Sequence, residues 1–291
     1  MLNGGKQIVL CPNPERDIGM KMTLEIREML IKAGHDVVVS PVFAHLHGDD
    51  FLPNPIETVP LSESAKNASL LICFGGDGTI LKTARTVMES PVPILGVNLG
   101  HKGFMAEIEP NEMDLIVSAA NGEFVPVSRM MLDVELMRNG KVIFSDSALN
   151  DAIICGTATT IKVSAYGDDC KITEYKGDGI IVATPTGSTA YSLSAGGSLV
   201  EPTAKNILIT PICAHVISVR PFVLAPDRVV TIKTGENEGK QIWLAVDGGE
   251  LIPFLAEDEL KIKMSQHYTI MAHVSGKSFY DIVFKKLGER T

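Results

Sequence analysis

The sequence predicts an α/β N-terminal domain with a parallel sheet, a β-rich C-terminal domain, and a final helix that returns to the first domain. In the first third, short apolar runs alternate with segments whose apolar residues recur at helical spacing. After Val125, strand-like runs follow one another with one good helix among them. The 291 residues suffice for two cores, at roughly 150 residues per domain. We expect residues 1–126 and 273–291 to form the first domain and residues 127–272 the second.

The N-terminal domain is expected to alternate strands and helices, as parallel sheets do. Gly34 suits the left-handed residue that commonly ends a helix, and a loop over roughly residues 45–60 follows the second strand. Thr79 is the expected N-cap of a later helix, because its hydroxyl can accept a bond from a free backbone N–H. The expected strands are Gln7–Cys11, Asp36–Ser40, Ser69–Phe74 and Val92–Val97, and the expected helices are Asp17–Ala33, Thr79–Met88 and Glu109–Ala120.

The C-terminal domain is expected to begin with a hairpin. Polar and apolar residues alternate over Ser128–Met137, Asn139-Gly140 is a strong two-residue turn signal, and Lys141–Asp146 is the return strand. One helix is expected over Ser188–Ala195, and Phe279–Leu287 has the spacing of the final helix. The further expected strands are Thr160–Ala165, Gly179–Ala183, Ile207–Pro211, Val229–Thr234, Gln241–Val246 and Glu259–Met264.

The composition disfavours several classes of protein. Acidic residues exceed basic ones by 35 − 26 = 9, and this negative charge argues against an extended nucleic-acid surface. No apolar run approaches the ~20 residues that span a membrane, and the N-terminus leads directly into a strand without a signal peptide. The five cysteines are scattered without a Cys-x-x-Cys pair, as in a reducing compartment. We therefore expect a cytoplasmic protein with no membrane or nucleic-acid partner.

The sharpest local feature is Gly75-Gly76-Asp77-Gly78-Thr79, between a strand and a helix. Ligands of α/β sheets collect at the carboxyl ends of strands, and backbone N–H groups at a helix start favour phosphate. A carboxylate repels phosphate, so Asp77 needs another role, and accepting a proton from an attacking hydroxyl fits. A Gly-Asp-Gly turn without a ligand is the alternative. The Walker motif is excluded, because no Gly-Lys-Ser/Thr follows.

Two further segments carry polar groups in a pattern suited to a nucleotide. The block Thr184–Gly197, preceded by Asp178, joins a strand to a helix that opens with hydroxyl groups, and Tyr191 could contact a base. Asn150 and Asp151 offer an amide and a carboxylate, which match the two hydroxyls of a ribose. An ordinary capped helix start and an Asx-type turn are the respective alternatives.

These segments, in this order and spacing, make the sequence similar to the NAD kinase family of ATP- or polyphosphate-dependent NAD kinases. The resemblance spans most of the chain. The Gly-Gly-Asp-Gly-Thr turn is shared with diacylglycerol and sphingoid-lipid kinases, whereas Thr184–Gly197 together with Asn150-Asp151 is far more specific. The other matching parts are Asn98-Leu99-Gly100, Gly103-Phe104, Val246-Asp247-Gly248 and Lys286-Leu287-Gly288. In two departures, Asp151 stands where Glu is more usual and Gly249 where many bacterial members carry Gln.

The resemblance implies an enzyme that transfers the terminal phosphoryl group of ATP or polyphosphate to the adenosine 2′-hydroxyl of NAD, making NADP. NAD would lie between the α/β domain and a β-sandwich-like domain, in a homodimer or homotetramer. Asp77 looks like the catalytic base, with Gly76, Gly78 and Thr79 near the phosphates. The other positions implied for NAD or ATP are Asn150, Asp151, Lys176, Asp178, Thr186, Thr189, Ala190, Tyr191, Ser194 and His215.

The expected cofactor is a divalent cation. The sequence has no clustered carboxylates for a protein-only metal cage, so Mg²⁺ is expected to arrive on the phosphates of ATP. A diacylglycerol-type lipid kinase and a non-catalytic NAD(P) sensor are the alternative functions. The lipid kinase lacks a hydrophobic or basic membrane-binding stretch, and a pure sensor has no use for the carboxylate of Asp77.

Overall fold

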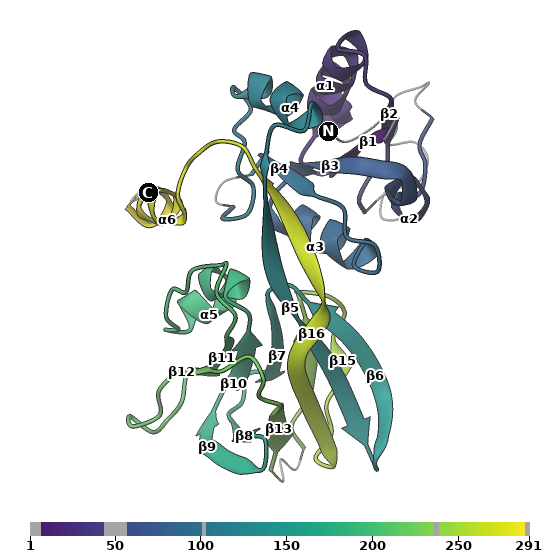
Figure 1. Ribbon diagram of the computed structural model, residues 1–291. Coiled ribbons are helices and arrows are strands. Elements are labelled where there is room, and N and C mark those ends of the chain that lie inside the picture. The colour runs from purple at the N-terminus through teal and green to yellow at the C-terminus, as the bar shows by residue number, and fades with distance from the viewer. Residues whose placement is uncertain (1–6, 44–56, 101–102, 236–238, 289–291) are drawn as a thin grey trace. The chain divides into compact units, whose positions relative to one another are not determined.

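Figure 1 shows the computed structural model, which describes residues 7–43, 57–100, 103–235 and 239–288. Contacts divide the chain into a first unit, Met1–Ser128 with Thr269–Thr291, and a second unit, Arg129–Tyr268. The predicted fold class is confirmed, because the first unit is α/β with a parallel sheet and the second is rich in antiparallel strands. Most of the expected loop over residues 45–60 lies outside the described residues. No helix in the described ranges is both long and apolar enough to cross a membrane.

The first unit is a parallel sheet with helices on both faces (Figure 1). Its strand order is β2-β1-β3-β4, and Met271 of β16 pairs in parallel with Ile94 of β4. Apolar side chains of α1 and α4 pack in one core with one face of the sheet. On the other face, α3 packs closely on β4, where the Ile80 side chain contacts Gly96. The strands are β1 (Gln7–Pro12), β2 (Val37–Val39), β3 (Ala68–Gly75), β4 (Ile94–Asn98) and β16 (Asp258–His273), and the helices are α1 (Lys21–Lys32), α2 (Leu61–Ser64), α3 (Asp77–Thr86), α4 (Met113–Ala120) and α6 (Phe279–Gly288).

The final helix belongs to the first unit, as predicted. The Lys286 ammonium of α6 lies 3.9 Å from Glu109 Oε1, and Lys277, just before the helix, pairs with Glu112 at 2.8 Å. Both ion pairs join the chain's last segment to residues that precede α4 in the sequence. This arrangement brings a positive charge into the unit that contains Asp77. Burial raises the pKa of the Asp77 carboxyl, and the Lys286 charge opposes part of that rise.

Two helices begin later than the sequence predicts. Helix α1 begins at Lys21 rather than at residue 17, because Gly19 and Met20 adopt left-handed conformations with φ of 66° and 53°. Helix α4 begins at Met113 rather than at residue 109, because its N-cap residue Glu112 has a non-helical backbone, with φ of −107° and ψ of 37°. Residue Gly34 ends α1 with a φ of 90°, so its predicted left-handed role is confirmed.

The second unit packs two antiparallel layers around one apolar core. One sheet has the order β12-β11-β10-β7-β14-β15, and the other layer contains β16-β13-β8-β9 with the hairpin of β5 and β6. The predicted hairpin is confirmed, with Asn139 and Gly140 at φ of 50° and 75°. The strands are β5 (Val125–Arg138), β6 (Lys141–Ala148), β7 (Asp151–Gly156), β8 (Ile161–Gly167), β9 (Cys170–Gly177), β10 (Gly179–Ala183), β11 (Ile207–Ile212), β12 (Phe222–Leu224), β13 (Val230–Thr234), β14 (Ile242–Val246) and β15 (Ile252–Pro253).

Two features of the second unit differ from the prediction. The helix expected over residues 188–195 is wrong. The segment forms a short 3-10 turn, Thr186–Thr189, and one turn of α-helix, α5 (Tyr191–Ser194), separated by Ala190 with a ψ of −132°. Strands β7, β9, β12 and β15 were not foreseen. Strand β9 lies at a sheet edge, and its exposed residues Lys171, Glu174 and Lys176 do not alternate regularly with apolar ones, so the pattern of a half-buried strand is weak.

Candidate active site

The Gly75–Thr79 turn lies where β3 ends and α3 begins, at the sheet edge where ligands of parallel sheets collect. The expected N-cap role of Thr79 is wrong, because Gly76 caps α3 and the Thr79 N–H already donates to Gly76 O at 3.0 Å. Thr79 is buried, and its Oγ1 accepts a hydrogen bond from Asn13 Nδ2 at 3.1 Å. Position 75 requires glycine, because an added Cβ would lie 2.3 Å from Thr79 Oγ1.

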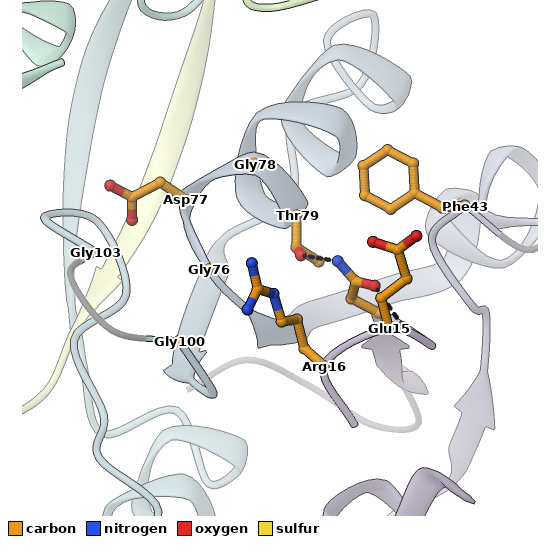
Figure 2. Close-up of a pocket in the computed structure, with 10 residues that line it drawn as sticks. Glu15, Arg16, Phe43, Gly76, Asp77, Gly78, Thr79, Gly100 and Gly103 are labelled. Carbon is orange, nitrogen blue, oxygen red and sulfur yellow. Dashed lines mark hydrogen bonds between the residues drawn. The ribbon is translucent and has the colours of Figure 1, made fainter. Parts of the chain in front are cut away.

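A pocket of about 360 Å³ lies over this turn (Figure 2). Four of its lining residues were predicted from the sequence, namely Gly76, Asp77, Gly78 and Thr79. Sequence reasoning missed Asn13, Glu15, Arg16, Phe43, Gly100 and Gly103. Asn13, Glu15 and Arg16 follow β1, which pairs in parallel with β3. The chain after each of these two strands therefore reaches the same sheet edge, and this strand pairing is what the sequence did not indicate.

The Gly76–Gly78 turn separates Asp77 from the other charged side chains of the pocket, because Arg16 and Glu15 both lie on the side of Thr79 (Figure 2). In Figure 2, Arg16 lies beside Thr79, whereas the Asp77 carboxylate lies across the Gly76–Gly78 turn, on the side of Gly103. The Arg16 guanidinium is exposed and makes no ion pair or side-chain hydrogen bond with any residue that the structure describes. Arg16 and the N-terminus of α3, whose first N–H groups lack intrahelical partners, thus form one surface suited to an anion.

Three backbone amides hold the Asp77 carboxylate. Oδ2 accepts a bond from Phe104 N at 2.8 Å, and Oδ1 accepts bonds from Met105 N at 3.0 Å and Ala106 N at 3.4 Å. Gly103 permits this approach, because a Cβ there would lie 2.7 Å from Asp77 Oδ1. Burial raises the pKa of Asp77, although the three amides and Lys286 oppose the rise. A raised pKa makes the carboxylate a stronger proton acceptor.

In the second unit, the structure brings Asn150 and Asp151 against the Thr184–Gly197 block. Thr184 N donates to Asn150 O at 2.8 Å, and an added Cβ at Gly187 would lie 2.2 Å from that same oxygen. Asn150 Oδ1 accepts no hydrogen bond, so the side chain forms no Asx turn. The alternative reading of Asn150 as an Asx-type turn is therefore wrong, and Asp151 is the first residue of β7.

Two of the predicted ligand residues present buried polar atoms without partners. Asn150 Oδ1 and Thr186 Oγ1 are both inaccessible to solvent and hydrogen-bond to no described residue. An unsatisfied buried polar atom costs about 1–3 kcal/mol. A polar ligand that reached both atoms would remove this cost.

Asp151 is a buried carboxyl whose pKa is raised to about 7. Burial is the larger cause, and the negative charge of the nearby Asp247 adds to it. A carboxyl that is half protonated near neutral pH can either donate or accept a hydrogen bond. Strongly perturbed carboxyls gather at functional sites more often than elsewhere.

The other predicted positions lie in β9, in the residues just after β9 and just after β11, and in the block that contains α5. Burial, Cys155, Cys213 and Asp178 raise the pKa of the Tyr191 phenol, so Asp178 and Tyr191 are close enough to interact. Lys176 is exposed, and its carbonyl accepts a bond from His215 N at 2.9 Å. Thr189 donates its hydroxyl hydrogen to Thr186 O at 3.1 Å, Ala190 forms the break before α5, and Ser194 is exposed at its end.

Among the residues that the structure describes, no three His, Cys, Asp or Glu side chains lie together so that they could hold a metal ion. The pocket of the first unit does include the carboxylate of Glu15, which is the type of oxygen ligand that Mg²⁺ takes. The lining residues therefore suit a phosphate chain that carries its own cation.

Comparisons with known proteins agree over both units. The ATP-NAD kinase N-terminal domain matches residues 8–121, and the ATP-NAD kinase C-terminal domain matches residues 149–274. The chain is similar to NAD kinase of Ruminiclostridium cellulolyticum, with 37% identity over 288 residues that cover 98% of this chain and 99% of the relative. It is 36% identical over 288 residues to NAD kinase of Acetivibrio thermocellus, covering 98% of each chain.

Two solved structures have the same fold. Yeast NADH kinase, crystallised with NADH, has a TM-score of 0.83 at 24% identity, covering 100% of this chain and 89% of the yeast chain. An NAD kinase from Archaeoglobus fulgidus, crystallised with ATP, has a TM-score of 0.72 at 22% identity, covering 98% and 100%. None of these similarities supports the lipid-kinase or sensor alternatives. Because both domain families and the full-length relatives match, the chain belongs to the NAD kinase family.

Proposed function

We propose that the chain transfers the terminal phosphoryl group of ATP to the adenosine 2′-hydroxyl of NAD, with Asp77 as the catalytic base. The observation that carries this assignment is the Asp77 carboxylate, which is held by three amides across a glycine-rich turn from an anion-binding surface. This arrangement answers the objection that a carboxylate repels phosphate, because the turn separates the two charges.

In the proposed step, Asp77 takes the proton of the 2′-hydroxyl as its oxygen attacks the γ-phosphorus. The new O–P bond forms while the bond to the β-phosphate oxygen breaks, and ADP leaves with that electron pair. The N–H groups of the α3 N-terminus and the Arg16 guanidinium bind the phosphate oxygens. Gly76 and Gly78 leave room for the phosphates, since an added Cβ at either would point into open space. Thr79 positions Asn13 through their hydrogen bond.

Binding of NAD is assigned to the second unit. Asn150 and Thr186 contact polar groups of NAD with their unpartnered oxygens, and Asp151 contacts a ribose hydroxyl. Tyr191 packs on a base. The further contacts to NAD or ATP that we assign are those of Lys176, Asp178, Thr189, Ala190, Ser194 and His215.

Mg²⁺ bound to the donor phosphates would neutralise their charge, with Glu15 available as an oxygen ligand. A homodimer or homotetramer in the cytoplasm is the expected form of the enzyme. Light scattering of the purified chain in reducing buffer tests the oligomeric state, and a monomer at micromolar concentration would contradict it.

The function is tested by incubating the purified chain with Mg²⁺, ATP and either NAD or diacylglycerol. NADP formation, measured with an NADP-specific dehydrogenase, supports the proposal. Asp77→Asn should lower turnover at least ~10²-fold, because an amide cannot accept the proton. Asp114→Asn is the matched control, since Asp114 is an exposed carboxyl in the first turn of another helix, α4. No NADP with ATP, other nucleoside triphosphates or polyphosphate would refute the function.

A further inference from the structure

Asp247 lies in the turn after β14, outside the residues that we assign to substrate contact. Its Oδ1 accepts bonds from Asn150 N at 2.8 Å and from Asp151 N at 3.0 Å, and its Oδ2 accepts a bond from Leu149 N at 2.7 Å. In the opposite direction, Asp247 N donates to Asp151 O at 2.9 Å. Four hydrogen bonds therefore join this one residue to three successive residues at the start of β7.

A turn-forming role alone does not explain the carboxylate. Asp247 and Gly248 have φ values of 48° and 67°, and Gly249 N donates to Val246 O at 2.9 Å, which makes a two-residue turn of the mirror-image type. Asparagine suits such a turn as well as aspartate does. It has only one acceptor oxygen, however, and its NH₂ group would face a backbone N–H. Three incoming amides require a carboxylate.

The backbone that Asp247 holds carries two side chains of the proposed NAD site. Asn150 Oδ1 is buried without a partner, and Asp151 is buried beside it in the sequence. The other side of this backbone is held by Thr184, whose N–H donates to Asn150 O. We propose that Asp247 is a positioning residue that fixes Asn150 and Asp151 in their NAD-binding conformation. This inference rests on the proposed function of these two side chains.

The test compares Asp247→Asn with Asp168→Asn. Asp168 is also left-handed, with a φ of 53°, and its carboxylate accepts bonds from Val229 N at 3.0 Å and Arg228 Nη1 at 2.9 Å, but it is exposed and outside the proposed site. Asp247→Asn should raise the KM for NAD about 10-fold or more, as expected for lost hydrogen bonds to a charged group. The KM for ATP should stay unchanged and turnover should fall less than the KM rises. Asp168→Asn should resemble the wild type.

A double-mutant cycle separates positioning from a general loss of structure. If Asp247 acts through Asn150, the increase in KM caused by Asp247→Asn should shrink at least several-fold in an Asn150→Ala background. Equal increases in both backgrounds, or an unchanged KM in Asp247→Asn alone, would overturn the proposal.

A second measurement does not depend on catalysis. Amide hydrogen exchange at residues 149–151 should be at least ~10-fold faster in Asp247→Asn than in Asp168→Asn, because these N–H groups lose acceptors. Unchanged exchange at residues 149–151 would overturn the proposed positioning role of Asp247, even if the enzyme were active. If the wild-type chain makes no NADP and exchange is still faster in Asp247→Asn, the proposed function is refuted and the positioning of residues 149–151 by Asp247 stands.

Discussion

Gly103→Ala tests whether the position of the Asp77 carboxylate sets the rate. The added Cβ would lie 2.7 Å from Asp77 Oδ1, whereas ordinary van der Waals contact begins at 3.4 Å, so one of the two must move by 3.4 − 2.7 = 0.7 Å. The backbone at position 103 leads directly into the three amides that bind this carboxylate. Any shift that relieves the clash therefore disturbs those hydrogen bonds.

The size of the effect follows from this geometry. Oδ1 accepts the bonds from Met105 and Ala106, at 3.0 and 3.4 Å, and the shorter of these is the main loss. A hydrogen bond to a charged group contributes about 1.5–3 kcal/mol to stability. A reacting group misplaced by about 1 Å costs roughly 10²-fold in rate. The displacement expected in Gly103→Ala, ~0.7 Å, is somewhat smaller than about 1 Å. It should therefore lower turnover about 10- to 100-fold, with a smaller change in the KM for NAD.

The assay is the initial rate of NADP formation at saturating NAD and ATP, with circular dichroism melts on the same samples. Gly288→Ala is the control, because an added Cβ there meets nothing within 4 Å. If Gly103→Ala melts normally and turns over at the wild-type rate, the position of the Asp77 carboxylate does not set the rate, and the reasoning is refuted.

Four further outcomes are expected. Because the pKa of Asp77 is raised, turnover should fall as the pH drops through that raised value, and Asp77→Asn should lose this limb of the pH profile. Thr186→Val removes a buried hydroxyl oxygen that has no partner, so it should leave the free protein as stable or more so while weakening NAD binding by about 1–3 kcal/mol in calorimetry; unchanged affinity would show that NAD does not reach Thr186. Tyr191→Ala should weaken NAD binding by about 1–3 kcal/mol, and an equal dissociation constant would remove Tyr191 from the site. The pKa of Asp151 is about 7 in the folded chain and ~4 in an unfolded chain, so the folded protein loses stability as the pH rises from ~4 to ~7. Asp151→Asn removes this loss, so in urea unfolding it should stabilise the protein by up to about 4 kcal/mol at pH 8 and by little at pH 4.

The parts of the site that could be predicted from sequence are those held within one local segment. The Gly75–Thr79 turn follows from three glycines between an apolar strand and a helix, and its position at a sheet edge follows from the alternation of strands and helices. The start of α3 was misplaced by two residues, because Gly76 and Thr79 both suit an N-cap and local chemistry does not choose between them. The buried hydrogen bond from Asn13 to Thr79, across 66 residues, makes that choice.

Long-range contacts account for what the sequence did not reveal. Arg16 reaches the pocket because β1 pairs with β3, and nothing in its own neighbourhood marks it as a ligand residue. In the local sequence Asp247 looks like a turn residue of an Asp-Gly hairpin, whereas its hydrogen bond from Asn150 N spans 97 positions. The sequence predicts a helix over Ser188–Ala195, yet Ala190 breaks it, and Gly187 just before it packs on the backbone of Asn150. Tertiary packing overrode propensity there.

The carboxylates of Asp77 and Asp247 make the same kind of backbone contact, although they lie in different units. Each is followed by glycine, and each accepts bonds from three successive amides of another segment. At Asp247 the carboxylate only positions other residues, so its loss should act on binding. At Asp77 the carboxylate that fixes the backbone is also the proposed proton acceptor, so Asp77→Asn removes both contributions at once. Gly103→Ala disturbs the position and keeps the base. Gly103→Ala should therefore keep the fall in turnover at low pH, whereas Asp77→Asn should lose it, and an Asp77→Asn enzyme that kept this fall would reduce Asp77 to a structural role.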